Sequence, residues 1–345
     1  MHAHGQIEMK KEYICTIMEL EGIYHSSIPS FFGEIMHAPA MERLRNVGMN
    51  CGCEYTRTLR SRHIGAYSRF EHSVGAGLIV WHFTSDVRQS VSALLHDVAT
   101  PVFAHVVDFL HGDHMRQEST ESTTLSAIAS SPELVAALSA LGLKPEDVSD
   151  YHLFPIADND TPRLSSDRLE YTMGNLVNYG FGTLADARRL YSDLMVGTNE
   201  EGAPEIMFRT KAAASEFARL ALDCSKVYVS DEDRYTMQML AELLRDQIAR
   251  GVLCEADLWR TEPEVIARLQ SDPEAAAAWA EYCAYGKVVA DAPGPKARKI
   301  NAKKRHINPF VEGVGRVTDF DADFRASLQA FLGRSFDYWI SSDND

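Results

Sequence analysis

The fold of this chain is decided by two apolar stretches, RFEHSVGAGLIV at residues 69–80 and ALLHDVATPVFAH at residues 93–105. Each stretch predicts a helical segment, and the first carries His72 close to its start. The second carries the adjacent pair His96 and Asp97. Such a pair brings a nitrogen and a carboxylate ligand to one metal ion, and His72 on the neighbouring helix supplies a second nitrogen.

The composition is that of a large globular protein. The 345 residues suffice for one large helical domain, or for one domain with an appended lobe. Hydrophobic residues make up 45% of the chain, and no apolar run approaches the length of a membrane span. The first residues lack the apolar core of a secretory signal, and six cysteines are too sparse for a disulfide framework. We therefore expect a cytoplasmic protein that does not contact a membrane.

The Cys51-x-Cys53 pair is interpreted as packing thiols rather than a metal site, because no second pair follows at zinc-ribbon spacing.

The charge distribution favours a local anion site inside an acidic protein. The formal net charge of −15 argues against strong nucleic-acid binding. Between Arg43 and Arg69, however, six arginines are opposed by a single acid, Glu54. Most of this cluster is interpreted as a solvated basic face. Arg69 is the exception, because it precedes His72 by three residues and so lies on the same side of a helix.

Helix signals dominate the chain, which predicts a mainly α fold with a helical core, additional helices and a small C-terminal lobe. Complete start signals open helices after Ser131, Thr261 and Asp272, and residues 233–251 have an amphipathic helical spacing. Strand candidates are few, namely KVYVS at residues 226–230 and RHINPFVEGVGRV at residues 305–317.

The His-Asp stretch is interpreted as a helix end, a turn at residues 98–100 and a new helix from Pro101. Adjacent side chains converge best where a helix ends, because within a regular helix they point about 100° apart. His105 would then lie one turn into the next helix, where it faces an anion or serves as a structural histidine at the edge of the core.

The fourth ligand is expected to be a carboxylate from far along the chain. Asp167 in SSDRLEYTMGN opens an amphipathic helix, so it is preferred over Asp158 and Asp160 in the polar DNDTP turn. Arg168 and Tyr171 would line the same cavity. Tyr228 and Lys226 are candidate substrate contacts, or else a packed tyrosine beside a surface lysine.

These motifs resemble the HD-domain phosphohydrolases, and within them the deoxynucleoside triphosphate triphosphohydrolase branch. The resemblance covers roughly residues 18–240 and extends more weakly to 315. It rests on MERLRNVG, AYSRFEHSVGAG, LLHDVATPVFAH and DRLEY, which occur in this order, and more weakly on SKVYVSDEDR and KARKINAKKRHINPFVEG. It implies a helical core at residues 1–240, followed at 241–345 by a helical extension with a basic loop (292–308) and a small terminal lobe.

The resemblance also implies roles for individual residues. One divalent metal ion (Zn, Mn, Fe, Co or Ni, with Mg as a further option) is expected on His72, His96, Asp97 and Asp167. His105 corresponds to a histidine that assists the chemistry and, when protonated, would donate to a phosphate oxygen; Asp97 belongs with it in the catalytic set. The substrate contacts implied are Arg69 for phosphate, Arg168 at a position that is commonly basic and Tyr171 near the sugar. Relatives in this branch often form homo-oligomers, which we expect here.

Some positions depart from the family pattern. Ala99 and Thr100 replace a glycine and a histidine, and Gln117 replaces a histidine before Glu118. His111 and His114 are close enough in sequence to substitute for the missing histidines.

The leading hypothesis is hydrolysis of a nucleotide, a deoxynucleoside triphosphate, to nucleoside and triphosphate. One alternative is a phosphomonoesterase or phosphodiesterase of the same superfamily with a second metal at His105, His111 or His114. Another is a nucleotide-binding regulator that has lost turnover, which Thr100 and Gln117 favour. The basic loop is left as an allosteric nucleotide site, a subunit contact or a solvated loop.

Overall fold

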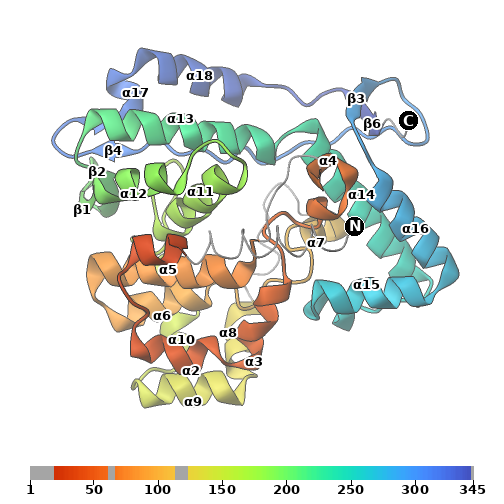
Figure 1. Cartoon of the computed structure of the whole chain (residues 1–345), viewed down its shortest axis with the longest axis horizontal. Helices are drawn as coiled ribbons and strands as arrows, with labels where there is room; N and C mark the ends of the chain where they lie inside the picture. Colours follow the sequence, from red (N-terminus) through yellow and green to blue (C-terminus); the bar gives the residue numbers. More distant parts are fainter. Residues whose placement is uncertain (1–18, 61–66, 113–122, 343–345) are drawn as a thin grey trace.

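The computed structural model describes residues 19–60, 67–112 and 123–342. The described chain is mainly helical, with two small sheets, which confirms the predicted fold class (Figure 1). The longer helices are α5 (Arg69–Thr84), α6 (Val87–Leu95), α9 (Pro132–Ala140), α11 (Ser166–Asn178), α12 (Leu184–Ser192), α13 (Lys211–Tyr228), α14 (Asp231–Ala249), α15 (Glu262–Ser271), α16 (Pro273–Ala284) and α18 (Ala322–Gly333). The shorter ones are α2 (Gly33–Met36), α3 (Pro39–Glu42), α4 (Arg57–Arg60), α7 (Val106–His111), α8 (Thr124–Ala129), α10 (Pro145–Val148) and α17 (Val317–Phe320).

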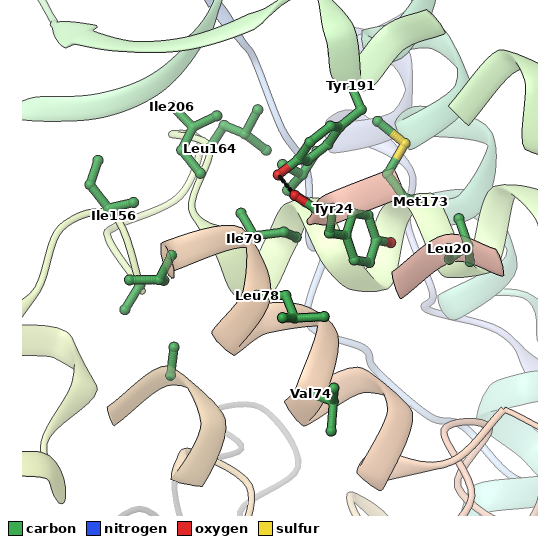
Figure 2. Packing of buried hydrophobic residues seen from close by; sticks show 14 of the residues in the cluster. Leu20, Tyr24, Val74, Leu78, Ile79, Ile156, Leu164, Met173, Tyr191 and Ile206 are labelled. Carbon is green, nitrogen blue, oxygen red and sulfur yellow. Dashed lines mark hydrogen bonds between the residues drawn. The ribbon is translucent and has the colours of Figure 1, made fainter. Parts of the chain in front are cut away.

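Helix α5 is the centre of the first core. Ser68 caps its first turn in a capping box with Glu71, and the helix is buried almost all round. Figure 2 shows its residues Val74, Leu78 and Ile79 among apolar side chains from several other segments. Burial on every side leaves α5 little freedom to shift, so the side chains that it carries are held in place.

The chain after α6 departs from the predicted course. Helix α6 ends at Leu95 and His96 caps it, as expected. The next helix, α7, begins at Val106 and not at Pro101, because Phe103 and Ala104 have φ angles of 57° and 47°. These left-handed conformations cannot continue a right-handed helix. The prediction that His105 lies one turn into the helix is therefore wrong: it is the N-terminal cap residue.

The second core is built from α7, α14, α15, α16 and neighbouring segments. It takes up Phe103, whose ring lies 6.2 Å from the rings of Tyr55 and of Trp279, measured between centroids. The helices predicted after Ser131, Thr261 and Asp272, and across residues 233–251, are confirmed as α9, α15, α16 and α14. Helix α14 runs through residue 240, the predicted boundary; a division there into separate domains stays a prediction.

Two small sheets account for the described strands. One has the order β1 (Leu194–Thr198), β2 (Pro204–Phe208), β4 (Phe310–Val311) and β5 (Gly315–Arg316), and the other pairs β3 (Val288–Asp291) with β6 (Trp339–Ser342). The strand predicted at residues 226–230 is wrong, because residues 226–228 continue the amphipathic helix α13. The strand predicted at residues 305–317 is right in part, as the short hairpin of β4 and β5. The sequence analysis missed β1, β2, β3 and β6.

The C-terminal segments return to the helical body. Helix α18 lies along α13 in Figure 1 and places Phe324, Leu328 and Phe331 in the first core. Strand β6 pairs with β3 beside the second core. Within the described ranges, no helix combines the length and apolar character that a membrane span requires.

Candidate metal centre and cavity

The four predicted metal ligands converge. The Nε2 atoms of His72 and His96 are 3.1 Å apart. Asp167 Oδ1 lies 3.1 Å from the first nitrogen and 3.6 Å from the second. Asp97 Oδ2 lies 3.8 and 3.6 Å from the same two atoms. Ligands held at about 2.1 Å from one cation are about 3.0–3.4 Å apart in octahedral or tetrahedral geometry. The two separations of 3.1 Å lie in this range and the three of 3.6–3.8 Å are slightly longer, so binding of a single ion requires a small inward shift of the carboxylates.

The second nitrogen of each imidazole is held by the protein. His96 Nδ1 donates to the backbone carbonyl of Ala93 at 2.7 Å. His72 Nδ1 donates to the Glu170 carboxylate at 2.5 Å. In neutral rings both Nε2 atoms therefore carry lone pairs, and two lone pairs 3.1 Å apart repel unless a cation lies between them. The donor set and its hydrogen bonds thus fit a divalent metal ion.

Glu170 is a candidate site residue that the sequence analysis did not single out. Its carboxylate accepts hydrogen bonds from the hydroxyls of Tyr24 and Tyr67 as well as from His72. The carboxylate packs against Gly75, where a Cβ atom would lie 2.6 Å from its side chain. The signal was available, since Glu170 lies one helical turn after Asp167 in the DRLEY motif.

Asp97 is kept ionised by its neighbours. Burial would raise the pKa of this carboxyl group, but the Arg69 guanidinium and the two imidazoles hold it well below its usual range. Arg69 Nη1 donates to Asp97 Oδ2 at 2.9 Å, and Thr100 Oγ1 donates to Oδ1 at 2.6 Å. Thr100, which departs from the family pattern, therefore orients a candidate ligand.

His72 is tied to two carboxylates. Burial alone would lower its pKa, but the hydrogen bonds to Asp167 and Glu170 raise the pKa of His72 to about 10. The His72 and His96 imidazoles hold the pKa of Asp167 far below its usual range, against the effect of burial. In the absence of a metal ion, the centre is a compact cluster of opposite charges.

The rival carboxylates have other partners. Asp158 pairs with His152 at 2.9 Å and with Arg168 at 3.3 Å. The side chain of Asp160 is 94% exposed. Of the three candidates, Asp167 is the one whose carboxylate contacts His72 and His96, which supports the choice made from the sequence.

The metal centre lies in the wall of a cavity of about 900 Å³. Arg168 and Tyr171 line it, as predicted, although Arg168 is held by Asp158, Asn159 and the backbone of Arg163. Tyr228 also lines the cavity and contacts Tyr171, with ring centroids 6.1 Å apart.

The other residues considered from the sequence have other partners, are buried thiols or lie outside the described residues. Lys226 is half exposed and pairs with Asp223. Cys51 and Cys53 are buried, and burial raises the pKa of the Cys51 thiol to about 12, which suits packing better than metal binding. The side chain of His111, and the whole of His114 and Gln117, lie outside the described residues.

His105 lies against the cavity with both ring nitrogens engaged. Nδ1 faces Asp108 Oδ2 at 2.9 Å, and Nε2 faces Arg305 Nη2 at 3.4 Å. Burial and the charges of Arg305 and Arg69 lower the pKa of His105, although Asp108 opposes them. The neutral ring is favoured, and with Nδ1 donating to Asp108 its Nε2 atom is an acceptor. Its expected role as a protonated donor is therefore not supported by this geometry.

Arg305 is a second residue that the sequence analysis missed as a site component. It belongs to the basic loop, and Lys303, Lys304 and Arg305 are among the residues that line the cavity. No spacing rule connects a residue so far along the chain to the His-Asp motif, so tertiary structure alone reveals the contact.

Comparisons with known proteins found partial matches, one of them to a protein named as a phosphohydrolase. No family model matches the chain. It is 26% identical over 200 residues to the uncharacterized protein YdhJ of Bacillus subtilis, a match that covers 58% of this chain and 60% of that protein. It is 25% identical over 202 residues to the metal-dependent phosphohydrolase cns2 of Cordyceps militaris, which covers 58% of this chain and 54% of that protein. The chain thus matches less than two thirds of the length of either relative.

Solved structures share the fold over nearly the whole chain. A phosphohydrolase from Bacteroides thetaiotaomicron superimposes with a TM-score of 0.63 at 14% identity, covering 92% of this chain and 97% of the other. A hypothetical protein from Aquifex aeolicus gives a TM-score of 0.61 at 16% identity, covering 92% and 93%. At these identities the likeness establishes the fold alone.

Proposed function

We propose that this protein is a metal-dependent phosphohydrolase of the HD-domain type that acts on a nucleotide, and specifically a deoxynucleoside triphosphate, with nucleoside and triphosphate as products. The observation that carries the proposal is the convergence of two imidazoles and two carboxylates at the wall of a large cavity. The similarity to cns2, named a metal-dependent phosphohydrolase, supports the reaction class.

The four side chains would hold the cation and leave the cavity side of it open to ligands. A divalent cation in such a site lowers the pKa of a coordinated water and takes up charge that develops on a phosphate oxygen. His72 and His96 present their Nε2 lone pairs because Glu170 and the Ala93 carbonyl fix their other nitrogens. Thr100 and Arg69 hold Asp97 in the orientation that the site needs.

His105 is placed to act as a proton acceptor. Its neutral ring has Nδ1 committed to Asp108, which leaves Nε2 facing the cavity and Arg305. Asp108 would stabilise the imidazolium that forms when Nε2 takes a proton from an attacking water. This assignment replaces the protonated donor expected from the sequence.

The cavity has the size and lining for a nucleotide. Its volume of about 900 Å³ is at the upper end of the range for small-molecule sites, about 300–1,000 Å³. Six arginine and lysine residues and five aspartates line it, in a chain whose net charge is −15, so the cavity is far less acidic than the rest of the protein. Tyr171 and Tyr228 offer aromatic surface for a sugar or a base.

The arrangement favours one metal ion over two. A second ion on His105 would have to displace the Arg305 guanidinium from Nε2. Repulsion between these two cations disfavours a dinuclear phosphomonoesterase or phosphodiesterase whose second ion lies on His105. The other two positions considered for that ion, His111 and His114, have side chains outside the described residues.

Elemental analysis of the purified protein, followed by product identification with a nucleotide panel, tests the proposal. We expect one metal ion per chain and release of triphosphate from deoxynucleoside triphosphates. Two ions with orthophosphate as product would establish the alternative enzyme. Tight nucleotide binding without product, under several metals, would establish a regulator.

A further inference from the structure

Arg43 is half-buried, although the sequence favours a solvated face for most arginines of its cluster. It begins the short 3-10 helix η2 (Arg43–Asn46), whose residue Leu44 is fully buried in the first core. Burial lowers the pKa of the Arg43 guanidinium to about 10, and the charge of Asp97 opposes that shift. A cation withdrawn from water costs free energy unless hydrogen bonds compensate, so the partners of this guanidinium indicate its role.

The Arg43 guanidinium donates to three backbone carbonyl groups from two distant segments. Nη2 donates to the carbonyl oxygens of Val98 at 3.2 Å and of Thr100 at 2.6 Å. Nη1 donates to the carbonyl oxygen of Arg260 at 3.3 Å, just before α15 begins. Buried carbonyl groups need hydrogen-bond donors, and the planar fork of one arginine can serve several of them. Arg43 therefore joins the turn after the His-Asp pair to the segment that leads into the second core.

The same turn is tied to a candidate metal ligand. The Thr100 amide donates to the Asp97 carbonyl at 2.8 Å, and the Thr100 hydroxyl donates to the Asp97 carboxylate at 2.6 Å. Two residues later, the Val102 amide donates at 2.8 Å to the carbonyl of Leu258, a member of the second core. The backbone of residues 97–102 thus lies between the metal centre and the second core, with hydrogen bonds to both.

No continuing helix holds this turn in place. Helix α6 ends at Leu95, and the left-handed residues Phe103 and Ala104 follow the turn before α7 begins. A shift of the turn would move Asp97 and the Thr100 hydroxyl that orients its carboxylate. Residues that fix the orientation of a metal ligand affect the affinity of a site, and here the fixing contact is made through the backbone.

We infer that Arg43 is a positioning residue of the metal centre: by fixing the turn at residues 98–100 against the second core, it sets the direction in which the Asp97 carboxylate is presented. This role deepens the proposed function and rests on it for the identity of the centre as a metal site. Arg43 is not among the described residues that line the cavity, so it acts through the turn. The second core, whose helices carry none of the four candidate ligands, becomes a support of the metal centre.

Competition between the full-length protein and a chelator for Co²⁺ tests the inference, because the titration gives a Kd and the visible absorption of bound Co²⁺ reports its coordination geometry. Loss of a residue that orients a ligand costs about 10- to 100-fold in metal affinity, and we expect about tenfold for Arg43→Met, which acts through the backbone. The absorption spectrum at saturating Co²⁺ should change as well. Arg43→Lys should restore part of the affinity, since lysine keeps a charged donor but lacks the planar fork that spans the carbonyls.

Arg88→Met is the matched control. The Arg88 guanidinium also donates to a backbone carbonyl, that of Asp147 at 2.8 Å, but it lies at the opposite end of α6 from the His-Asp pair. This variant should keep the wild-type Kd and spectrum. Melting temperatures of all variants would be compared, and if Arg43→Met were unstable, Arg43→Lys would serve as the test.

Combination with Thr100→Val separates positioning from general stabilisation. The Thr100 hydroxyl holds the same carboxylate whose direction Arg43 sets, so the double variant should lose less affinity than the product of the two single losses. Two unrelated effects on the protein would multiply instead.

Three results would overturn the inference: an unchanged Co²⁺ Kd in the Arg43 variants, a lower melting temperature with the wild-type spectrum at saturating Co²⁺, or losses that multiply in the double variant. If the wild type hydrolysed no nucleotide while Arg43→Met changed the Kd and the spectrum, the proposed function alone would fail. If the wild type hydrolysed nucleotides and the Arg43 variants kept its Kd and spectrum, this inference alone would fail. A wild type that bound no Co²⁺ or other divalent metal would remove the centre on which both depend.

Discussion

The protein buries two clusters of acidic side chains, and the surroundings of each cluster give its carboxyl groups opposite properties. At the metal centre, Asp97 and Asp167 face two imidazoles and Arg69, which hold both pKa values below the usual range despite burial. In the second cluster, burial raises the pKa values of Glu54 and Glu262, and the charge of Glu262 adds to the shift of Glu54, whose pKa is raised to about 8.

The contrast shows how to distinguish a cation site from a structural acid pair. Glu262 accepts hydrogen bonds from the Gly48 amide at 2.9 Å and the Tyr55 hydroxyl at 2.8 Å, while Glu54 Oε2 has no hydrogen-bond partner among the described residues. No imidazole contributes to these contacts. Burial of acids is therefore shared by both clusters. What distinguishes the metal centre is a pair of imidazoles, each with its second nitrogen held by a hydrogen bond to the protein.

The largest effect is expected from Asp97→Ala. This substitution removes one candidate ligand and leaves Arg69 buried without its carboxylate partner, so metal content and turnover should both be lost. Elemental analysis and hydrolysis assays would measure the two losses. The exposed Asp323 on α18 provides the control, since Asp323→Ala should retain both. Full metal content in Asp97→Ala would refute the assignment of the centre.

Glu170→Gln should weaken metal binding about 10- to 100-fold, the usual cost of losing a hydrogen-bond partner of a ligand. An amide offers one acceptor oxygen where three donors, His72, Tyr24 and Tyr67, meet the carboxylate. Metal titration monitored by competition with a chelator would report the change. Glu54→Gln is the same substitution in the other acid cluster and should leave metal affinity unaltered; a similar loss in both variants would remove the distinction between the clusters.

Gly75→Ala should lower metal affinity by a smaller factor than Glu170→Gln. Its Cβ atom would lie 2.6–2.9 Å from the Glu170 side chain and would displace the carboxylate that orients His72. The same titration applies. The control is Gly33→Ala on α2, where a Cβ atom meets nothing within 4 Å. Unchanged affinity in Gly75→Ala would mean that Glu170 can shift without disturbing the imidazole.

The smallest effect is expected on stability, from Glu54→Gln. Because the pKa of Glu54 is raised from 4.5 to about 8, its protonated form favours folding, and this contribution is complete below about pH 4.5 and is lost as the pH rises through 8. The wild type should therefore lose free energy of unfolding relative to Glu54→Gln between pH 5 and 9, by about 1–3 kcal/mol. Urea unfolding at several pH values would measure the difference; parallel pH profiles would contradict it.

Much of the candidate site could be predicted from local sequence. His72, His96 and Asp97 lie on two apolar stretches whose helical character is strong, and Asp167 opens a helix with a clear cap at Ser165. The course of residues 101–105 could not be predicted, because the left-handed conformations of Phe103 and Ala104 are stabilised by packing in the second core and not by local propensity. For the same reason the expected position of His105 was wrong.

The sequence by itself determined the helical fold class and the four residues that converge on the candidate metal centre, because caps, apolar periodicity and the His-Asp pair are local signals. Tertiary structure decided that Glu170 orients His72 and that Arg305, from the basic loop, lines the cavity beside His105. These outcomes depend on contacts between segments far apart in the chain, which no local pattern specifies.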